Sequence, residues 1–417
     1  MKRKRIASSR FRLSAYWIAL VLAGTMSASG GAVTYDANLL YINTSFENAS
    51  PLYWEIGEGG VVHVYLVYDQ ERASPNRANG HWFFQAQTRP GAEVTFVLHN
   101  FDNVWNGKKS SVARDNTLCV TSEDATTWSV VSTRKTDDNG LTFKIAAGSG
   151  SFYVARMEPY RLADLEELKH DICERPNVDV TSIGKTVQGR DLEIIRVGNA
   201  EAPYRVLLRA RAHPWEAGGN WVVQGLIERL LRGDADARRC LDRYCVYIMP
   251  MANKDGVVCG WTRFNLLGAD LNRKWDRPPD PAINPENHAL ENWLRSMVAK
   301  GQSPQLMIDF HNDSSGKLHV SRPNIDLESY LKKMERLEAM LREHTWFTEG
   351  STGANYRNPG TIGEGLLERF GIPACVLELN ANWIAGLNDH PSAKHWERFG
   401  AQLCKAFYRY FDEAGSN

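Results

Sequence analysis

Two residues at helical spacing, His213 and Glu216, form the pattern His-x-x-Glu between an apolar run and a predicted helix. On a turn or a first helical turn, side chains three residues apart lie on the same face. Imidazole nitrogen and carboxylate oxygen are both good zinc donors, and a catalytic zinc site takes three protein ligands and leaves one position open for water. The pair therefore predicts two of three zinc ligands. An ordinary pair of surface residues is the alternative for so short a pattern.

The third ligand is predicted at His311, which directly follows the apolar residues 307–310. A short continuous apolar run bounded by polar residues is typical of a buried strand. His311 is therefore expected at the end of a strand, where it can complete the set with His213 and Glu216. A core or capping histidine is the alternative at this position.

The elements that must position these residues follow from the pattern after residue 159. Apolar residues at helical spacing predict helices over residues 162–172 and around residues 221–231. Short continuous apolar runs predict strands that are covered on both faces; they occupy residues 192–197, 205–210, 244–249, 305–310 and 374–379. We therefore expect residues 159–417 to form an α/β domain with a central mixed sheet flanked by helices.

Ligands of such domains gather outside the carboxyl ends of the strands. Four polar residues fall at or just past these ends, namely His213, Asn253, His311 and Glu378. Their shared position predicts one common site. A Gly-rich loop over residues 249–257 and 260–275 adds Arg263 and Arg273. Because a guanidinium fork binds a carboxylate bidentately, this loop suits an anionic ligand, and a solvated polar loop is the alternative.

The preceding part, residues 31–158, has a different pattern. Short alternating or aromatic-rich runs are separated by breaks rich in Gly, Pro, Asn and Asp; the runs occupy residues 61–67, 82–86, 93–98, 128–131, 141–145 and 151–154. Period-two runs with such breaks predict an antiparallel β-sandwich. Its His, Asp, Glu and Cys residues are not grouped in a way that indicates chemistry. A folding or docking module is therefore expected, with a substrate-gating or ligand-binding module as the alternative.

Residues 1–30 combine six basic residues, an apolar run over residues 15–24 and small residues toward the end. This is the layout of a secretory signal peptide, so the protein is expected to be exported to a periplasm or out of the cell. A membrane anchor is the alternative, although the apolar run is only about half of the ~20 residues that a span needs. No later segment is long and apolar enough to cross a bilayer, so no stable span is expected after cleavage.

Composition narrows the partners. Without residues 1–30 the chain keeps 43 Lys and Arg against 49 Asp and Glu, a net charge of about −6, which disfavours a nucleic-acid partner. The seven cysteines form no Cys-x-x-Cys pair, so they do not indicate a thiolate metal site. In an exported protein they are candidates for disulfides, but the sequence does not determine the pairing, and their odd number leaves at least one thiol free.

The order of these motifs resembles the zinc metallocarboxypeptidase family. His-x-x-Glu, Asn-x-Asp-Gly, Arg, Asp-x-Asn-Arg, a strand-end His and a strand-borne Glu begin here at His213, Asn253, Arg263, Asp270, His311 and Glu378. The Leu-Asn-Arg form in residues 270–273 and the β-domain in front look most like the cytosolic-carboxypeptidase branch. The loop departs from the usual Asn-Pro-Asp form, since Lys254 stands where the family has proline.

The resemblance implies one Zn²⁺ ion per site, bound by His213, Glu216 and His311. Asp270 matches the carboxylate that orients the first zinc histidine, an interaction that fixes the ring tautomer and raises the basicity of the ligand. Glu378 matches the general base. An unpaired carboxylate inside an apolar strand is costly, so a purely structural role explains Glu378 poorly.

The resemblance also implies how the substrate is held. Arg263 matches the arginine that stabilises the oxyanion, and Asn272 with Arg273 matches the pair that binds the substrate's terminal carboxylate. Tyr356 is the candidate for the family's mobile tyrosine. The residue at the floor of the specificity pocket falls near Glu364, which would favour a basic terminal side chain if the alignment places it there.

The expected function is that of a zinc metallocarboxypeptidase, a hydrolase that cuts the C-terminal peptide or isopeptide bond of an exported or extracellular peptide. Export puts a cytoplasmic tubulin-type substrate out of consideration. Two alternatives stay open. One is a zinc-dependent deacylase or amidase of the sister family that acts on N-acyl amino acids, and the other is an inactive relative that binds peptides.

Overall fold

The computed structural model describes residues 38–412, apart from residues 70–73, 75, 78, 106, 323–324, 326 and 354–359. The predicted signal peptide and Tyr356 therefore lie outside the described residues. Every described helix and strand lies within one compact unit that ends at Asn417 and begins at Ala37. Within the described residues, no helix has both the length and the apolar character that a membrane span requires.

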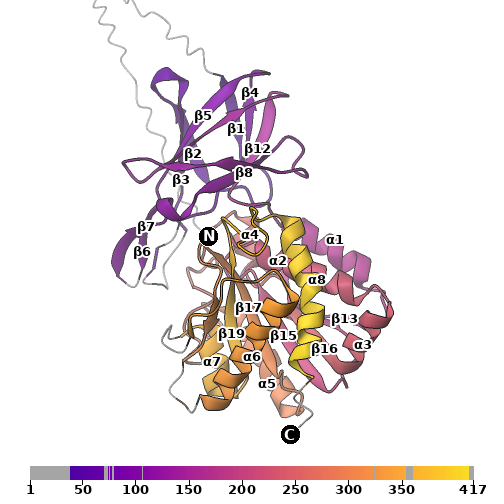
Figure 1. Ribbon diagram of the computed structural model, residues 1–417. Helices are drawn as coiled ribbons and strands as arrows, with labels where there is room; N and C mark the ends of the chain where they lie inside the picture. Colours follow the sequence, from indigo (N-terminus) through magenta and orange to yellow (C-terminus); the bar gives the residue numbers. More distant parts are fainter. Residues whose placement is uncertain are drawn as a thin grey trace, which may run out of the picture. The chain divides into compact units, whose positions relative to one another are not determined.

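Two five-stranded sheets build the N-terminal domain (Figure 1). The first is ordered β1 (Leu39–Asn43), β4 (Phe83–Thr88), β12 (Ser151–Ala155), β8 (Leu118–Ser122) and β9 (Ser129–Ser132). The second is ordered β10 (Arg134–Lys135), β11 (Leu141–Ala146), β5 (Glu93–His99), β3 (Val62–Leu66) and β2 (Leu52–Ile56). Because successive side chains of a strand point to opposite faces, alternate residues of both sheets, such as Phe84 and Phe96, meet in one buried core.

The predicted β-sandwich is confirmed, with one correction to its antiparallel character. Strands β3 and β5 are paired in parallel. Between them the chain passes through β4 in the other sheet, so no hairpin constrains the pair to be antiparallel. A separate hairpin, β6 (Asp102–Trp105) with β7 (Lys108–Ser111), belongs to neither sheet. Two short 3₁₀ turns, η1 (Glu58–Gly60) and η2 (Ala113–Asp115), complete this half.

A mixed sheet forms the centre of the second domain, as predicted, and it has seven strands, two more than the predicted apolar runs. Its order is β13 (Val178–Lys185), β14 (Asp191–Val197), β16 (Tyr244–Met249), β15 (Tyr204–Ala210), β17 (Leu306–Asp313), β19 (Ala374–Asn380) and β18 (Leu318–Val320). The four central strands β16, β15, β17 and β19 are parallel to one another. The outer strands β13, β14 and β18 join them in antiparallel pairs.

Helices cover both faces of this sheet (Figure 1). They are α1 (Leu162–Ile172), α2 (Gly218–Leu230), α3 (Ala235–Arg243), α4 (Lys254–Val258), α5 (Pro285–Ala299), α6 (Glu328–His344), α7 (Ile362–Phe370) and α8 (Ala393–Tyr410). In β15, Val206 and Leu208 pack into a core shared with α1, α2, α6 and α8, while Leu207 packs on the other face with α5 and α7. Burial on both faces explains the continuous apolar runs in the sequence.

The two domains are in close contact where the chain leaves α4. Gly260 has φ +65°, and a Cβ atom there would come within 2.0 Å of the Ala49 carbonyl oxygen, so only glycine fits this contact. Beside it, the Asn48 backbone N–H donates to Val258 at 3.2 Å, and the Asn48 side-chain amide donates to Val257 at 2.8 Å. These bonds place the sandwich against the loop that carries Arg263.

Candidate metal and catalytic centre

His213 and Glu216 lie in the turn that joins β15 to α2. Arg211 adopts a left-handed φ of 61°, and its guanidinium donates to the Pro214 carbonyl at 2.6 Å and to Asn220 at 3.1 Å. The Glu216 backbone N–H donates to the His213 carbonyl at 3.2 Å. This buried turn brings both side chains to the same side, as their spacing predicts, and excludes the surface-pair alternative because both are 3% exposed.

His311 lies on the neighbouring strand β17 and completes the predicted set. Its Nδ1 atom is 3.1 Å from His213 Nδ1 and 2.7 Å from Glu216 Oε2, while His213 Nδ1 is 2.8 Å from Glu216 Oε1. The sequence predicted His311 just past the end of its strand. The structure instead places it within β17, because pairing with β19 continues for two further residues, to Asp313.

Two carboxylates fix the orientation of the histidine rings. His213 Nε2 is 3.1 Å from Asp270 Oδ1, and His311 Nε2 is 2.7 Å from Asp309 Oδ2. Each Nε2 atom can therefore carry the ring proton and donate it, which leaves both Nδ1 lone pairs directed at Glu216. The predicted role of Asp270 fits this geometry, and Asp309 is an equivalent partner that the sequence did not reveal.

These residues suit a zinc ion. The nitrogen and oxygen donors of His213, Glu216 and His311 lie within 4.8 Å of one another and are buried. When the His311 proton is on Nε2, the buried Glu216 Oε2 faces the lone pair of His311 Nδ1 at 2.7 Å and receives no hydrogen bond from it, a costly arrangement unless a cation lies between them. Two imidazoles and one carboxylate are the donor set that catalytic zinc takes with a fourth position open.

Arg263 and Asp270 form a buried ion pair beside these ligands. Arg263 Nε and NH2 both lie 2.8 Å from Asp270 Oδ2. Burial alone would raise the pKa of Asp270, but the charges of Arg263 and His213 outweigh it and hold that pKa well below its usual range. Asp270 therefore stays ionised and links the arginine to the histidine ring.

Glu378 lies on β19 directly beside His311, and the two Cα atoms are register partners. Its Oε2 atom is buried and has no hydrogen-bond partner in the described part of the chain. Burial, followed by the negative charge of Asp313, raises the pKa of Glu378 well above its usual range. A carboxylate held this way has a higher proton affinity than an exposed one, which suits a general base.

Asn272 and Arg273, predicted to hold a carboxylate, both line the same pocket. The Asn272 side-chain oxygen accepts the Ile362 backbone N–H at 3.0 Å, and its amide nitrogen is 3.3 Å from His311 Nε2. The Asn272 carbonyl accepts from Arg273 NH1 at 2.7 Å. Asn272 is thus fixed by its neighbours with its amide group beside the ligands.

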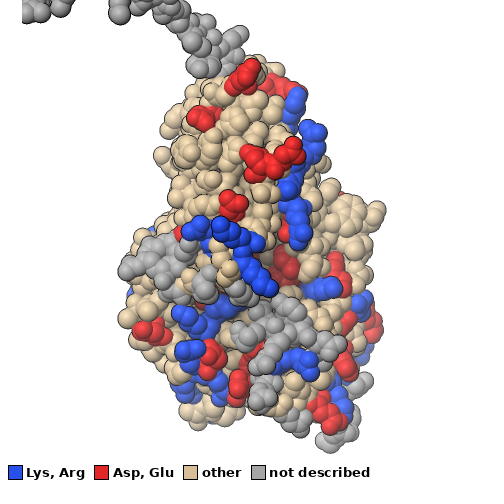
Figure 2. Space-filling model, turned by 90° about the vertical axis from the view of Figure 1, so that its left-hand side faces the viewer, with Lys and Arg blue, Asp and Glu red and all other residues tan. Residues whose placement is uncertain are grey.

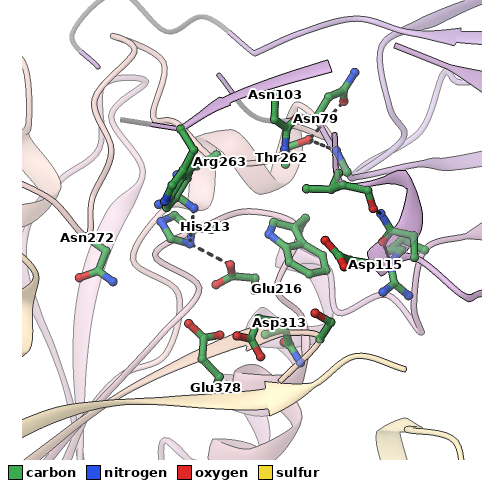
Figure 3. Close-up of a pocket in the computed structure, with 18 of the residues that line it drawn as sticks. Asn79, Asn103, Asp115, His213, Glu216, Thr262, Arg263, Asn272, Asp313 and Glu378 are labelled. Carbon is green, nitrogen blue, oxygen red and sulfur yellow. Dashed lines mark hydrogen bonds and ion pairs between the residues drawn. The ribbon is translucent and has the colours of Figure 1, made fainter. Parts of the chain in front are cut away.

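The pocket has a volume of about 340 Å³, and both domains line it (Figure 3). In Figure 3 the carboxylates of Glu216, Asp313 and Glu378 face the same space. The N-terminal domain, including the β6–β7 hairpin, contributes several lining residues that sequence reasoning missed, including Asn79, Asn103, Trp105, Asp115 and Arg156. A folding or docking module does not account for this, and the ligand-binding alternative fits it better. Isolated polar residues on separate strands give no spacing signal that could have revealed them.

Trp105 and Asp69 tie the sandwich to the arginines. The Trp105 ring lies 4.5 Å from the Arg263 guanidinium carbon and 5.3 Å from that of Arg273. The Asp69 carboxylate accepts backbone N–H groups from Thr262 at 2.9 Å and Phe264 at 3.1 Å, and also that of Arg263. The N-terminal domain therefore fixes the backbone segment that carries Arg263 and also packs the Trp105 ring over the Arg263 guanidinium.

Two other predicted residues, and the departure from the family pattern at Lys254, lie outside the residues that line the pocket. Asn253 caps α4 by accepting the Gly256 N–H at 3.0 Å and does not line the pocket. Lys254, which replaces the expected proline, is buried and pairs with Glu193. Glu364 is buried in the first turn of α7 and accepts the Arg322 backbone N–H at 3.2 Å, outside the residues that line this pocket. A preference for basic terminal residues therefore stays a prediction.

The described residues combine a buried His-Glu-His set on a mixed α/β sheet with a carboxylate and an arginine in the same pocket, which are the groups that a zinc-dependent hydrolase needs. Residues 165–320 match the family model described as zinc carboxypeptidase. This match supports the predicted resemblance to zinc carboxypeptidases over residues 165–320, and the group of His213, Glu216 and His311 fits the predicted zinc ion.

Known proteins match this chain over different lengths, in sequence over about a third of it and in fold over most of it. It is 34% identical over 142 residues to human "Cytosolic carboxypeptidase 4" and 36% identical over 152 residues to mouse "Cytosolic carboxypeptidase 1", matches that cover 34% and 36% of this chain. It spans only 12% of the length of either relative. A crystal structure of a metallo-carboxypeptidase from Burkholderia cenocepacia has the same fold, with a TM-score of 0.78 at 22% identity over 90% of this chain and 100% of that one.

Proposed function

We propose that this protein is a zinc-dependent carboxypeptidase that hydrolyses the C-terminal peptide or isopeptide bond of a peptide. The proposal rests on one observation. The buried group of His213, Glu216 and His311 lies at the same pocket as Glu378 and Arg263. Metal ligands alone fit many hydrolases. Beyond the metal ligands, Arg263 and Arg273 can bind anionic groups of a substrate, and the Glu378 carboxylate can activate water.

Each residue has a part that follows from its position. Zinc, when bound, acts as a Lewis acid and lowers the pKa of bound water to about 7. Glu378 accepts the proton of the attacking water, and Arg263 donates hydrogen bonds to the oxyanion that develops on the scissile carbonyl. Arg273 and Asn272 hold the terminal carboxylate of the peptide, which fixes the last bond in the pocket.

We propose further that the substrate is an exported or extracellular peptide. The basic, apolar and small-residue order of residues 1–30 supports export. The names of the curated relatives contain the word cytosolic, so the location needs its own test. The test is mass spectrometry of the N-terminus of the protein recovered from its native cells. A new N-terminus near residue 30, in a fraction outside the cytoplasm, supports export, and an intact Met1 in the cytoplasm excludes it.

The catalytic proposal is tested by product analysis on peptides that differ only in their last residue. A carboxypeptidase releases that residue, and treatment with a chelator abolishes the release until zinc is restored. Release of the acyl group from N-acyl amino acids, with the peptides left intact, identifies the deacylase instead. Binding of the peptides without any product identifies an inactive relative. The same panel shows whether basic terminal residues are preferred.

A further inference from the structure

Two cysteines far apart in the chain meet between α3 and α8. Cys404 Sγ lies 2.9 Å from Cys240 Sγ, although 164 residues separate them. Both are buried, with exposures of 5% for Cys240 and 3% for Cys404. The other five cysteines stand in separate places, namely β8 (Cys119), the end of α1 (Cys173), β16 (Cys245), the end of α4 (Cys259) and β19 (Cys375).

The packing of the helices holds these sulfurs together. Ala237 and Cys240 are the buried residues of α3, and they lie three positions apart on the face toward α8. Tyr244, which follows α3, donates its hydroxyl to the Cys404 carbonyl at 2.9 Å, and Cys240 Sγ donates to the same carbonyl at 3.5 Å. The backbone around both thiols is therefore fixed before any bond forms.

One of the two thiols is prepared for reaction. The hydrogen bond from Cys404 lowers the pKa of Cys240, and the charge of Arg229 acts in the same direction against the effect of burial. A cavity of about 550 Å³ adjoins the pair, and it is lined by both cysteines together with Arg229, Arg239, Lys405 and Arg409. This cavity gives a disulfide reagent a route to Cys240. Among the charged side chains that line it, Arg229 favours the Cys240 thiolate and Asp236 opposes it.

We propose that Cys240 and Cys404 form a disulfide that ties α3 to α8. The Cys240 thiolate attacks one sulfur of an external disulfide compound, here called the carrier. This attack breaks the S–S bond of the carrier and releases one carrier thiolate. Cys404 then loses its proton to solvent and attacks the Cys240 sulfur, which releases the second carrier thiolate. The two protein thiols are oxidised by two electrons in total, and the carrier disulfide is reduced to a dithiol or to two thiols. The sulfurs need to approach by less than about 1 Å to reach bonding distance.

The bond would stabilise the part of the molecule behind the zinc ligands. Helix α8 packs closely on α2, because glycines stand at the crossing; a Cβ on Gly400 would come within 1.9 Å of the Val222 carbonyl oxygen. Helix α2 begins at Gly218, two residues after Glu216. A link that closes so long a loop restricts the unfolded chain strongly, so reduction is expected to lower the melting temperature by roughly 5 °C.

The test uses the full chain and needs no activity. The protein is incubated with oxidised glutathione, unfolded in a thiol-blocking reagent and digested with trypsin. The expected product is a peptide of residues 240–243 joined by a disulfide to residues 399–405, together with a mass lower by two hydrogens and a melting temperature that reductant lowers. Blocked thiols at both Cys240 and Cys404, or a disulfide to any other cysteine, would overturn the proposal.

Variants give an independent readout. Cys240→Ser and Cys404→Ser are each expected to remove the linked peptide and the effect of reductant on the melting temperature. Cys173→Ser, at an exposed position, is the matched control and should keep both. Because the peptide map is read on the unmodified sequence, the result stands even if a serine variant folds poorly. None of these measurements depends on the proposed catalysis.

Discussion

Glu378 and His311 are register partners on the adjacent parallel strands β19 and β17. The proposed base and a proposed zinc ligand are therefore neighbours because of strand pairing, although 67 positions separate them in the chain. Any shift of this register by one residue would turn one of the two side chains to the opposite face of the sheet. The pairing between these strands thus determines the geometry of the site.

Removal of the Arg263 guanidinium should lower turnover while zinc stays bound. A donor to a developing oxyanion contributes about 3 to 4 kcal/mol to lowering the barrier, so Arg263→Ala is expected to reduce kcat by roughly 10² to 10³. Steady-state kinetics with zinc content measured on the same sample checks this. Arg277→Ala, whose side chain is 67% exposed, is the control. An unchanged kcat in Arg263→Ala would remove Arg263 from the chemistry.

Loss of the Asp270 carboxylate should weaken zinc binding. The Asp270 Oδ1 atom lies 3.1 Å from His213 Nε2 and so orients the ring. Removal of such a partner typically lowers metal affinity by about 10- to 100-fold. Asp270→Asn is expected to show that loss in a competition titration against a chelator. Asp276→Asn serves as a control, since Asp276 pairs with the exposed Arg277. Equal affinity in both variants would contradict the orienting role.

Trp105 tests whether the N-terminal domain contributes to substrate binding. Its ring lies over the guanidinium groups of Arg263 and Arg273, and each such contact is worth about 0.5 to 1 kcal/mol at an exposed site. Trp105→Ala is therefore expected to raise KM several-fold, and Trp105→Phe should restore most of the loss. Trp383→Ala, another exposed tryptophan, should leave KM unchanged. A KM that does not differ between Trp105→Ala and the unmodified protein would exclude a role in binding.

Stability should fall in mild acid because of His81, which is buried where the domains meet. Burial lowers the pKa of His81 from 6.5 to about 4, and its Nε2 is 3.1 Å from the Asn48 carbonyl oxygen. Between these two pKa values the unfolded chain binds more protons than the folded one, so stability is present above pH 6.5 and is lost as the pH falls toward 4. The slope is at most about 1.4 kcal/mol per pH unit.

Urea unfolding of the unmodified protein and of His81→Gln at several pH values isolates this contribution. Other groups titrate in both proteins. The contribution of His81 is therefore the difference between the two proteins in how steeply the free energy of unfolding changes with pH. The unmodified protein is expected to lose more stability than the variant from pH 6.5 to pH 4. Parallel profiles would show that His81 does not titrate as its burial implies.

Much of this structure was predictable because local patterns fixed it. Helix α1 occupies the predicted residues 162–172, and the five predicted apolar runs match β14, β15, β16, β17 and β19 closely, whereas the edge strands β13 and β18 were not predicted. The three candidate zinc ligands, which the structure brings together, could be predicted because His213 and Glu216 are near neighbours in the chain and His311 follows an apolar run. Basic and acidic side chains both occur on the face drawn in Figure 2, and the expectation of no nucleic-acid partner stays a prediction.

The remaining parts depend on contacts between distant segments. Asp69 and Trp105 reach Arg263 only after the sandwich packs on the second domain, and neither has a neighbour in the sequence that signals this role. Asp309 was hidden inside an apolar strand two residues before His311. The parallel pairing of β3 with β5 likewise follows from a crossover between sheets, which the alternation of residues along each strand does not encode.

The central claim is that zinc is bound by His213, Glu216 and His311 while Glu378 moves the proton. The most direct test is Glu378→Gln, measured for zinc content and for release of the C-terminal residue from a peptide on the same preparation. The account predicts one zinc ion per chain and a loss of turnover of at least about 10², the scale of general-base catalysis. Near-full turnover in Glu378→Gln with zinc bound would contradict it.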